Sequence, residues 1–260
     1  MIISGKNSIE EAFVAKKTIN RVYINNKIHD DFCERIVKYC KQNGIRYDFV
    51  DKKILDKFSL HNQGYVAEIT DYEYSSLDEI LNSKKEKGSF IILLDGVEDP
   101  HNLGSITRVA DCVGVDGIVI ENRHCCNVNE TVYKTSCGAI NHVKIAKVTN
   151  LNDTIKYLKK NGVWVFACDM DGADVFSSDL TGNVAIVLGG EGQGVSMLTK
   201  KLCDGVVSLP MFGKVNSLNV STACSAIVYE IVRQRQKNGW DFTISKKWRW
   251  KCNINPYGKI

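Results

Sequence analysis

The chain lacks any apolar run long enough to cross a membrane. Its longest runs, Phe90–Leu94 and Val184–Leu188, cover only a few residues each, whereas a membrane-spanning helix takes about 20. The N-terminal segment turns polar by its fourth residue, a pattern unlike that of a secretory signal peptide. We therefore expect a cytoplasmic protein with no membrane partner.

Paired cysteines are also missing. The ten cysteines are scattered, with no Cys-x-x-Cys pair, and disulfide frameworks are typical of small secreted chains. We therefore expect reduced thiols. His124, Cys125 and Cys126, with Cys137 further on, match no common zinc spacing, so we predict that no metal is bound.

No internal repeat and no low-complexity tract occurs in the 260 residues. A hydrophobic content of 44% and a charged content of 25% are ordinary for a globular protein, and the length predicts one or two domains. The net charge of +4 permits an anionic partner such as nucleic acid but does not require one.

Residues 1–72 have the pattern of a small α/β domain, and the polar residues 73–88 that of a linker with a short helix around Leu77–Asn82. Ser8, with Glu11 three positions later, predicts a helix start, and Gly44 predicts a helix stop. The expected strands are Arg21–Ile24, Ile45–Val50 and Tyr65–Ile69, and the expected helices are Ser8–Ala15, Asp31–Asn43 and Lys52–Phe58.

From Ser89 onward, short apolar strands alternate with helical stretches. This alternation predicts a mostly parallel sheet with helices on both faces and ligands at the carboxyl ends of its strands. The fold class is therefore α/β, with a second domain over residues 89–237 and a basic, aromatic tail over residues 238–260. The expected strands are Phe90–Leu94, Gly117–Ile120, His142–Ile145, Val163–Ala167, Val184–Leu188 and Val206–Leu209, and the expected helices are Leu103–Val113, Val128–Thr135, Leu151–Asn161, Ser196–Lys201 and Asn219–Lys237.

A long polar loop follows the strand Phe90–Leu94 and leads into a helix that carries Arg108. On one interpretation Asn102 caps that helix and Arg108 is a surface cation. Loops that leave buried strands often carry functional sites, so on the other interpretation both side chains face a pocket at the strand ends.

A second group of polar residues follows the strand Val184–Leu188, where Glu191 lies among the glycines of Gly189–Gly194. The spacing matches neither the Walker pattern nor Gly-x-Gly-x-x-Gly, and a carboxylate repels phosphate. Glycines allow the backbone to approach a ligand closely. We therefore expect a ligand that is cationic or donates hydrogen bonds.

A third group lies after Pro210, where Asn216, Ser217 and Asn219 precede a long helical pattern. Asn and Ser are common helix caps, so capping and a site role both remain open. The small residues Thr222, Ala223, Ser225 and Ala226 can pack on the sheet or on a second subunit. Two strand ends, two glycine turns and this helix start can together form one pocket for a polar cofactor.

Three segments in this order resemble the motifs of the SpoU/TrmH-type RNA 2'-O-ribose methyltransferases of the SPOUT class. The resemblance extends through about Gln236, and Ile3–Asn7 and His61–Ala67 are similar to the ends of the family's L30e-like RNA-binding domain. That domain occurs in the branch that modifies a guanosine of large-subunit (23S-type) ribosomal RNA. The three segments are Asp99–Gly104 through Arg108, Leu188–Gly194, and Leu209–Met211 with Ser217–Ser221.

The resemblance implies a specific enzyme. Its cofactor would be S-adenosyl-L-methionine, its partner RNA rather than DNA, its C-terminal half a trefoil knot, and its functional form a homodimer with cofactor pockets beside the subunit interface. By motif position, the catalytic residues would be Asn102, Arg108, Glu191, Ser217 and Asn219, and the cofactor-binding residues Gly189, Leu209, Met211, Leu218 and Cys168.

The resemblance also suggests roles for these residues. A guanidinium rarely gives up its proton, so we expect Arg108 to bind a substrate phosphate and stabilise the developing alkoxide. Asn102 and Asn219 would orient Arg108 and the ribose, and Glu191 and Ser217 would complete the network. The alternatives are a transfer RNA 2'-O-ribose methyltransferase and a catalytically idle RNA-binding or ribosome assembly factor.

Two further regions are candidates for RNA contact. The first is a basic rim of the N-terminal domain, with Lys16, Lys17, Arg21 and Lys27. The second is the tail Asn238–Ile260, in which tryptophans alternate with lysine and arginine, a combination that binds single-stranded RNA by stacking and charge. The tryptophans of the tail have an equal claim to pack on a protein surface.

Overall fold

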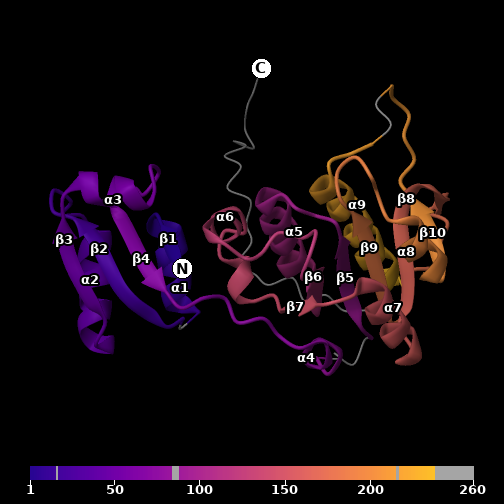
Figure 1. Cartoon of the computed structure of the whole chain (residues 1–260), viewed down its shortest axis with the longest axis horizontal. Coiled ribbons are helices and arrows are strands. Elements are labelled where there is room, and N and C mark those ends of the chain that lie inside the picture. Colours follow the sequence, from indigo (N-terminus) through magenta and orange to yellow (C-terminus); the bar gives the residue numbers. More distant parts are fainter. Residues whose placement is uncertain (16, 84–87, 215–216, 238–260) are drawn as a thin grey trace, which may run out of the picture.

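The computed structural model describes residues 1–15, 17–83, 88–214 and 217–237. Lys16, Asn216 and the tail Asn238–Ile260, which the sequence suggests for RNA contact or helix capping, lie outside the described residues. Two α/β units lie side by side along the long axis of the molecule (Figure 1). The N-terminal unit is the smaller of the two.

The N-terminal unit is built on a four-stranded sheet in the order β1-β4-β2-β3. The helix α2 has the predicted bounds, because the Asp30 side chain accepts from the Cys33 amide and Gly44 adopts a left-handed conformation at the end. The helix α1 begins at Lys6 after Gly5, so Ser8 is not its cap. The elements are β1 (Ile2–Ser4), α1 (Lys6–Val14), β2 (Ile19–Asn25), α2 (Asp31–Asn43), β3 (Arg46–Val50), α3 (Lys52–Phe58) and β4 (Tyr65–Ile69).

The segment predicted as a linker packs onto the C-terminal unit. Its helix α4 (Leu77–Leu81) begins with a capping box between Ser76 and Glu79. Ile80 is buried in the apolar cluster that also holds Ile91 of the large sheet. The linker helix therefore stabilises the large sheet instead of only joining the two units.

The C-terminal unit contains a six-stranded, all-parallel sheet in the order β10-β8-β9-β5-β6-β7, which confirms the predicted α/β fold with a parallel sheet. The strands are β5 (Phe90–Asp95), β6 (Gly117–Glu121), β7 (Ile145–Val148), β8 (Trp164–Asp174), β9 (Val184–Gly189) and β10 (Gly205–Ser208). The helices are α5 (Pro100–Val113), α6 (Glu130–Thr135), η1 (Ala139–Asn141), α7 (Leu151–Lys160), α8 (Met197–Leu202) and α9 (Val220–Lys237).

Both faces of this sheet are covered, which explains why its strands are apolar along their whole length. Along β5, Phe90 and Ile92 pack in a cluster with residues of α5 and α9. The alternate residue Ile91 packs in a second cluster with residues of α4 and α7. The strand order places the carboxyl ends of β5, β9 and β8 next to one another, and these ends carry the polar segments identified in the sequence.

Two strands differ from the sequence prediction. The strand expected at His142–Ile145 is β7 at Ile145–Val148, because Ala139–Asn141 forms a 3₁₀ turn. The strand expected to end at Ala167 continues as β8 to Asp174. Its register against β10 shifts, since Val206 pairs with Ala167 but Val207 pairs with Ala173. The residues from Cys168 to Gly172 therefore form a bulge.

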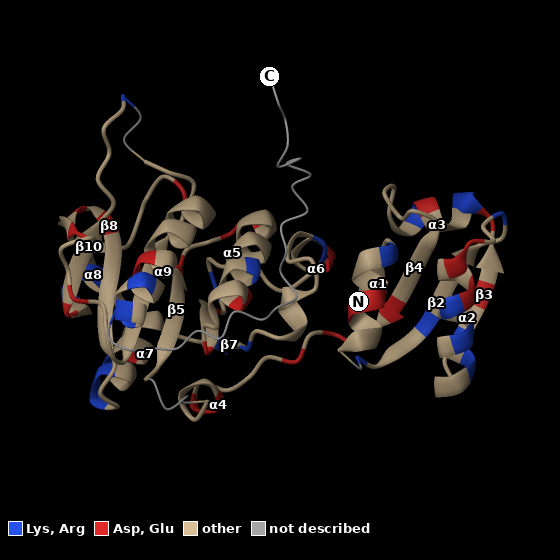
Figure 2. Ribbon diagram, turned by 180° about the vertical axis from the view of Figure 1, so that it is seen from behind, with Lys and Arg blue, Asp and Glu red and all other residues tan. Residues whose placement is uncertain are grey.

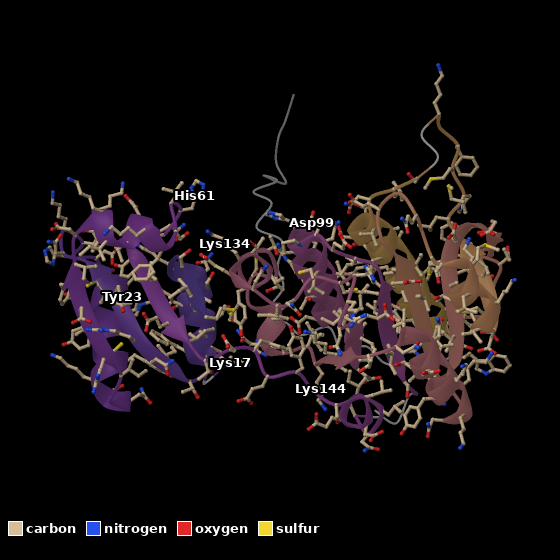
Figure 3. All side chains as sticks on the ribbon, in the orientation of Figure 1. Lys17, Tyr23, His61, Asp99, Lys134 and Lys144 are labelled. Carbon is tan, nitrogen blue, oxygen red and sulfur yellow. The ribbon has the colours of Figure 1, made fainter. Side chains whose placement is uncertain are left out.

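A polar contact joins the two units. The Ser4 hydroxyl of β1 donates to Glu130 Oε1 of α6 at 2.6 Å, and Lys134 Nζ lies 3.5 Å from the same hydroxyl. Lys134 and Lys17 are labelled near the junction of the units in Figure 3. In the part of the chain that the structure describes, no helix combines the length and the hydropathy that a bilayer crossing needs.

Candidate active site

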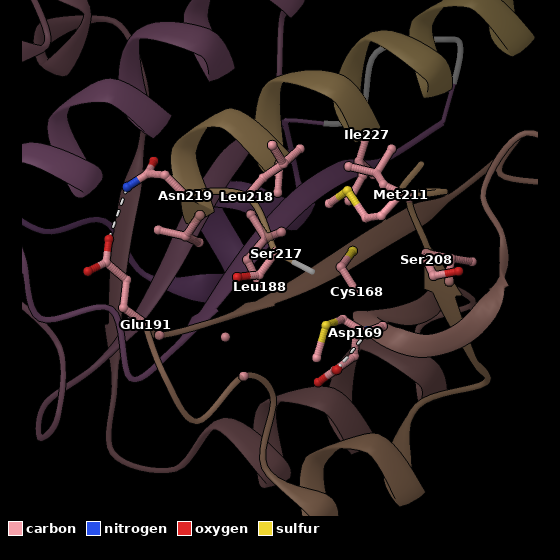
Figure 4. Close-up of a pocket in the computed structure, with 18 of the residues that line it drawn as sticks. Cys168, Asp169, Leu188, Glu191, Ser208, Met211, Ser217, Leu218, Asn219 and Ile227 are labelled. Carbon is pink, nitrogen blue, oxygen red and sulfur yellow. Dashed lines mark hydrogen bonds between the residues drawn. The ribbon is translucent and has the colours of Figure 1, made fainter. Parts of the chain in front are cut away.

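A cavity of about 550 Å³ opens at the carboxyl ends of β8, β9 and β10, beside the start of α9 (Figure 4). Its volume lies in the range typical of small-molecule sites. The predicted site residues that line it are Cys168, Gly189, Glu191, Leu209, Met211, Ser217, Leu218 and Asn219. Asn102 and Arg108 do not line it.

The glycines at the end of β9 are required by contacts between backbone segments. A Cβ atom on Gly190 would lie 2.0 Å from the carbonyl oxygen of Gly96, and one on Gly189 would lie 2.0 Å from the carbonyl carbon of Gly194. The Gly190 amide also donates to the Asp95 carbonyl at 2.8 Å. The sequence analysis explained these glycines by close approach of a ligand, but the close packing of two protein loops already requires them.

Three polar side chains from distant segments form a hydrogen-bonded triangle. Asn102 Nδ2 donates to Glu191 Oε1 at 3.0 Å, and Asn219 Nδ2 lies 2.9 Å from both Asn102 Oδ1 and Glu191 Oε1. The dashed line between Asn219 and Glu191 in Figure 4 marks their hydrogen bond. The triangle joins the first turn of α5, the glycine turn after β9 and the start of α9.

The capping interpretation is wrong for Asn102 and correct for Asn219. Asp99 caps α5 by accepting from the His101 amide at 2.8 Å, and Asn102 lies inside the helix and is 5% exposed. Asn219 Oδ1 accepts from the Ser221 amide at 2.9 Å just before α9 begins. Asn219 therefore caps a helix with its oxygen and holds Glu191 with its nitrogen.

Within a single chain, the Arg108 side chain does not contact this triangle. It is exposed on α5, and its guanidinium donates to the Cys137 sulfur at 3.6 Å. Six helical residues separate Arg108 from Asn102, a rotation of about 240° around the helix axis, so the two side chains leave α5 in different directions. The expected contact of Arg108 with Asn102 and Asn219 is absent among the described residues.

Cys168 faces the cavity as a neutral thiol. Burial raises its pKa well above the ordinary value, and burial also raises the pKa of Cys224 to about 12. A thiol in this state is a poor nucleophile and a poor metal ligand. Over the described ranges, no group of three or more His, Cys, Asp or Glu residues is arranged to hold a metal ion.

Sequence reasoning missed Asp169, which also lines the cavity. Its carboxylate is 2.8 Å from Lys200 Nζ and 3.2 Å from the Val195 amide. An aspartate two residues after the expected apolar strand was the available signal. It was overlooked because the strand was expected to end at Ala167 and because its partners lie much further along the chain.

Comparisons with known proteins agree on one family. Residues 89–229 match the model of the SpoU rRNA Methylase family, and residues 2–75 match a model described as RNA 2'-O ribose methyltransferase substrate binding. The chain is 41% identical over 244 residues to a putative TrmH family tRNA/rRNA methyltransferase of Staphylococcus haemolyticus, covering 92% of this chain and 98% of that protein. A protein of the same description from Staphylococcus aureus strain MSSA476 is 42% identical over 242 residues, with the same coverage.

Solved structures share the fold. The SpoU methyltransferase AviRb from Streptomyces viridochromogenes, in complex with AdoMet, aligns with a TM-score of 0.79 and 23% identity over 91% of this chain and 90% of that chain. The A. aeolicus TrmH/SpoU tRNA modifying enzyme aligns with a TM-score of 0.53 and 30% identity over 62% of this chain and 81% of that chain.

The two tasks of Asn219 can be separated by substitution. Asn219→Asp keeps a helix cap but places a second carboxylate beside Glu191, whose Oε1 is 2.9 Å from the replaced nitrogen. We expect a loss of about 1–2 kcal/mol in unfolding free energy at pH 7. The loss shrinks near pH 4, because protonation of one carboxyl removes the repulsion.

Urea unfolding at both pH values measures this effect. Asn219→Ser is the matched control, since it caps α9 without adding charge, and its difference from the wild type changes much less between the two pH values than that of Asn219→Asp. Equal pH dependence in the two variants would show that Asn219 does not lie against Glu191.

Proposed function

The chain belongs to the SpoU rRNA Methylase family, and from that membership we propose that it transfers a methyl group from S-adenosyl-L-methionine to a ribose 2'-hydroxyl in RNA. The observation that carries the proposal is the triangle of Asn102, Glu191 and Asn219 at the mouth of a cavity built on the carboxyl ends of parallel strands. Strand ends of this kind are the usual ligand sites of such sheets.

The cavity has the chemistry that S-adenosyl-L-methionine needs. Leu188, Leu209 and Met211 provide apolar walls for the adenosine, and Asp169 and Glu191 bring negative charge to a ligand with cationic groups. Bound there, the cofactor supplies a methyl group activated by the sulfonium. Gly189, Leu209, Met211, Leu218 and Cys168 would hold it.

The triangle orients the groups around the acceptor hydroxyl. Glu191 Oε1 is held by two amides, and Asn102 is almost fully buried, so the carboxylate is fixed before substrate binds. Fixed polar groups lower the barrier because they need not reorganise during the reaction. Ser217, on the same wall, adds a hydroxyl, and Arg108 binds a phosphate of the RNA and stabilises the developing alkoxide.

We propose that the N-terminal unit selects the RNA substrate and that this substrate is a guanosine of large-subunit ribosomal RNA. The match of residues 2–75 to a substrate-binding model supports an RNA-contacting role. Lysine and arginine occur on α2, α3 and β2 (Figure 2). Lys17 lies over the ring of Tyr72, and Arg21 is paired with Asp48 at 2.6 Å, so Lys17 is the better candidate for RNA contact.

We also propose that the functional form is a homodimer. The exposed stripe of α9 carries Thr222, Ala226 and Tyr229, and Tyr229 is 54% exposed. Phe212, close to the cavity residue Met211, is 95% exposed. Large exposed apolar side chains near a site often mark a subunit contact. In such a dimer, we propose that the Arg108 side chain of one copy completes the cavity of the other.

Methyl transfer tests the function directly. Purified protein is incubated with S-adenosyl-L-methionine carrying a labelled methyl group and with separate fragments of 23S-type ribosomal RNA and transfer RNA. We expect 2'-O-methylation of a guanosine in the ribosomal fragment. Methylation of the transfer RNA alone would favour the alternative substrate, and cofactor binding without transfer to any RNA would indicate an idle factor.

Arg108→Lys tests the role of the guanidinium. The variant keeps the charge but loses the two-pronged hydrogen-bonding geometry, so we expect turnover to fall by roughly a hundredfold. Cofactor affinity stays within about twofold, because Arg108 does not line the cavity. Single-turnover kinetics and calorimetry measure the two quantities. Near-normal turnover in Arg108→Lys would defeat the assignment.

Mixed dimers test whether Arg108 acts across the subunit interface. Arg108→Ala and Glu191→Ala are each expected to be inactive alone. A mixed dimer contains one site that has both Glu191 and the partner's Arg108, so mixing the two variants after mild unfolding restores about a quarter of wild-type activity by statistical assortment. No recovery, in a mixture shown to contain mixed dimers, would place Arg108 in the site of its own chain.

A further inference from the structure

The bulge in β8 moves Asp169 out of the strand ladder and onto the cavity wall. Cys168 still pairs with Leu188 of β9, whereas pairing with β10 breaks after Ala167 and resumes at Ala173. A bulge of this kind redirects the side chains that it carries. Figure 4 shows Asp169 beside Cys168 at the edge of the cavity.

The Asp169 carboxylate is held firmly but not saturated. Oδ2 lies 2.8 Å from Lys200 Nζ of α8 and accepts from the Val195 amide at 3.2 Å. Oδ1 accepts only from the amide of the next residue, Met170, at 2.7 Å among the described residues. A carboxylate has about four acceptor positions, so Oδ1 can accept a further hydrogen bond from a ligand in the cavity.

The charge of Asp169 is maintained although the side chain is only 13% exposed. Burial opposes ionisation, but hydrogen bonds from Lys200, Met170 and Val195 outweigh it and hold the pKa of the carboxyl below its ordinary value. The cavity wall therefore presents an ionised carboxylate at neutral pH, paired with Lys200 through Oδ2.

Neutralising Lys200 does not require Asp169. Asp171, two residues further on, also lies 3.0 Å from Lys200 Nζ, but its side chain is 65% exposed and it does not line the cavity. Lys200 thus has an acidic partner on the solvent side. Burying the second carboxylate, that of Asp169, costs desolvation energy. Its position on the cavity wall indicates that this carboxylate binds a ligand.

We propose that Asp169 is a cofactor-binding residue whose Oδ1 accepts a hydrogen bond from an N–H or O–H donor of S-adenosyl-L-methionine. This inference rests on the proposed function, because it takes that cofactor as the ligand of the cavity. The cofactor has two kinds of donor that suit a carboxylate, the α-ammonium of its amino-acid end and the hydroxyls and amine of its adenosine.

Isothermal titration of the full chain tests the inference without an activity assay. The ligands are S-adenosyl-L-methionine, S-adenosyl-L-homocysteine, which lacks the sulfonium charge, and 5'-methylthioadenosine, which lacks the amino-acid end. For Asp169→Asn we expect S-adenosyl-L-methionine to bind roughly ten- to a hundredfold more weakly, the loss of a hydrogen bond to a charged group. If the donor is the ammonium, S-adenosyl-L-homocysteine binding weakens equally and 5'-methylthioadenosine binding does not change.

If the donor belongs to the adenosine, all three ligands weaken by a similar factor, which also supports the inference. Weakening of S-adenosyl-L-methionine alone would overturn it, since only the charge on sulfur would then be sensed. Unchanged binding in Asp169→Asn overturns it too, while leaving the proposed function intact if the wild type binds the cofactor. A wild type that binds none of the ligands contradicts the proposed function itself.

Two controls separate ligand contact from support of the glycine turn. Asp171→Asn removes the exposed partner of Lys200 and is expected to bind all three ligands as the wild type does. Lys200→Met removes the ion pair but keeps the carboxylate, which still accepts from the Met170 and Val195 amides. Because loss of Lys200 raises the pKa of Asp169, the titration is made at pH 8, and we expect a change of less than about threefold in affinity. If Lys200→Met weakens binding as much as Asp169→Asn, Asp169 acts only by fixing the turn, and the inference fails. Thermal unfolding verifies that each variant is folded, and Asp169→Ser replaces Asp169→Asn if the latter is not.

Discussion

The hydrogen bonds among Asn102, Glu191 and Asn219 hold together three segments that lie far apart in the sequence. They tie α5, the glycine turn and α9 to one carboxylate oxygen. The amides carry no charge, so the negative charge of Glu191 remains available to a ligand. If the triangle opened, the start of α9 would lose its fixed position against the turn, and the cavity wall that carries Ser217 and Leu218 would move with it.

Backbone packing supports this arrangement from below. Gly190 lies against the carbonyl of Gly96 so closely that any side chain would collide, and this contact fixes the height of Glu191 above the sheet. On the other wall, the bulge in β8 places Cys168 and Asp169 against the cavity. One wall thus depends on the absence of side chains, and the other on an irregular strand.

Some features that depend on residues close together in the sequence, such as the bounds of α2 and the alternation of strands and helices, were predicted correctly. The bounds of α2 follow from Asp30 and Gly44, the alternation of strands and helices gave the parallel sheet, and three motifs identified the family correctly. Pro100 at the first position of α5 was a local signal that went unused, since proline favours that position and points to Asp99 rather than Asn102 as the cap.

Features that depend on tertiary pairing were not predictable in this way. The extension of β8 past Ala167 follows from its pairing with β10, which begins only at Gly205. The position and the ionised state of the Asp169 carboxylate depend on Lys200 and on the bulge in β8. The direction in which the Arg108 side chain points depends on how α5 packs against its neighbours, and the local sequence does not specify that packing. Motifs in the sequence predicted which residues form the site, whereas the geometry of these residues depends on contacts between distant segments.

The order of the chain has a consequence for biosynthesis. Glu191 and Asn102 emerge from the ribosome well before Asn219, yet the triangle needs all three. The nascent protein can therefore fold its N-terminal unit, whose sheet is complete at Ile69, while its cavity still lacks the wall that α9 completes. The cavity can therefore be completed only after α9 has been synthesised, well after the N-terminal unit is able to fold.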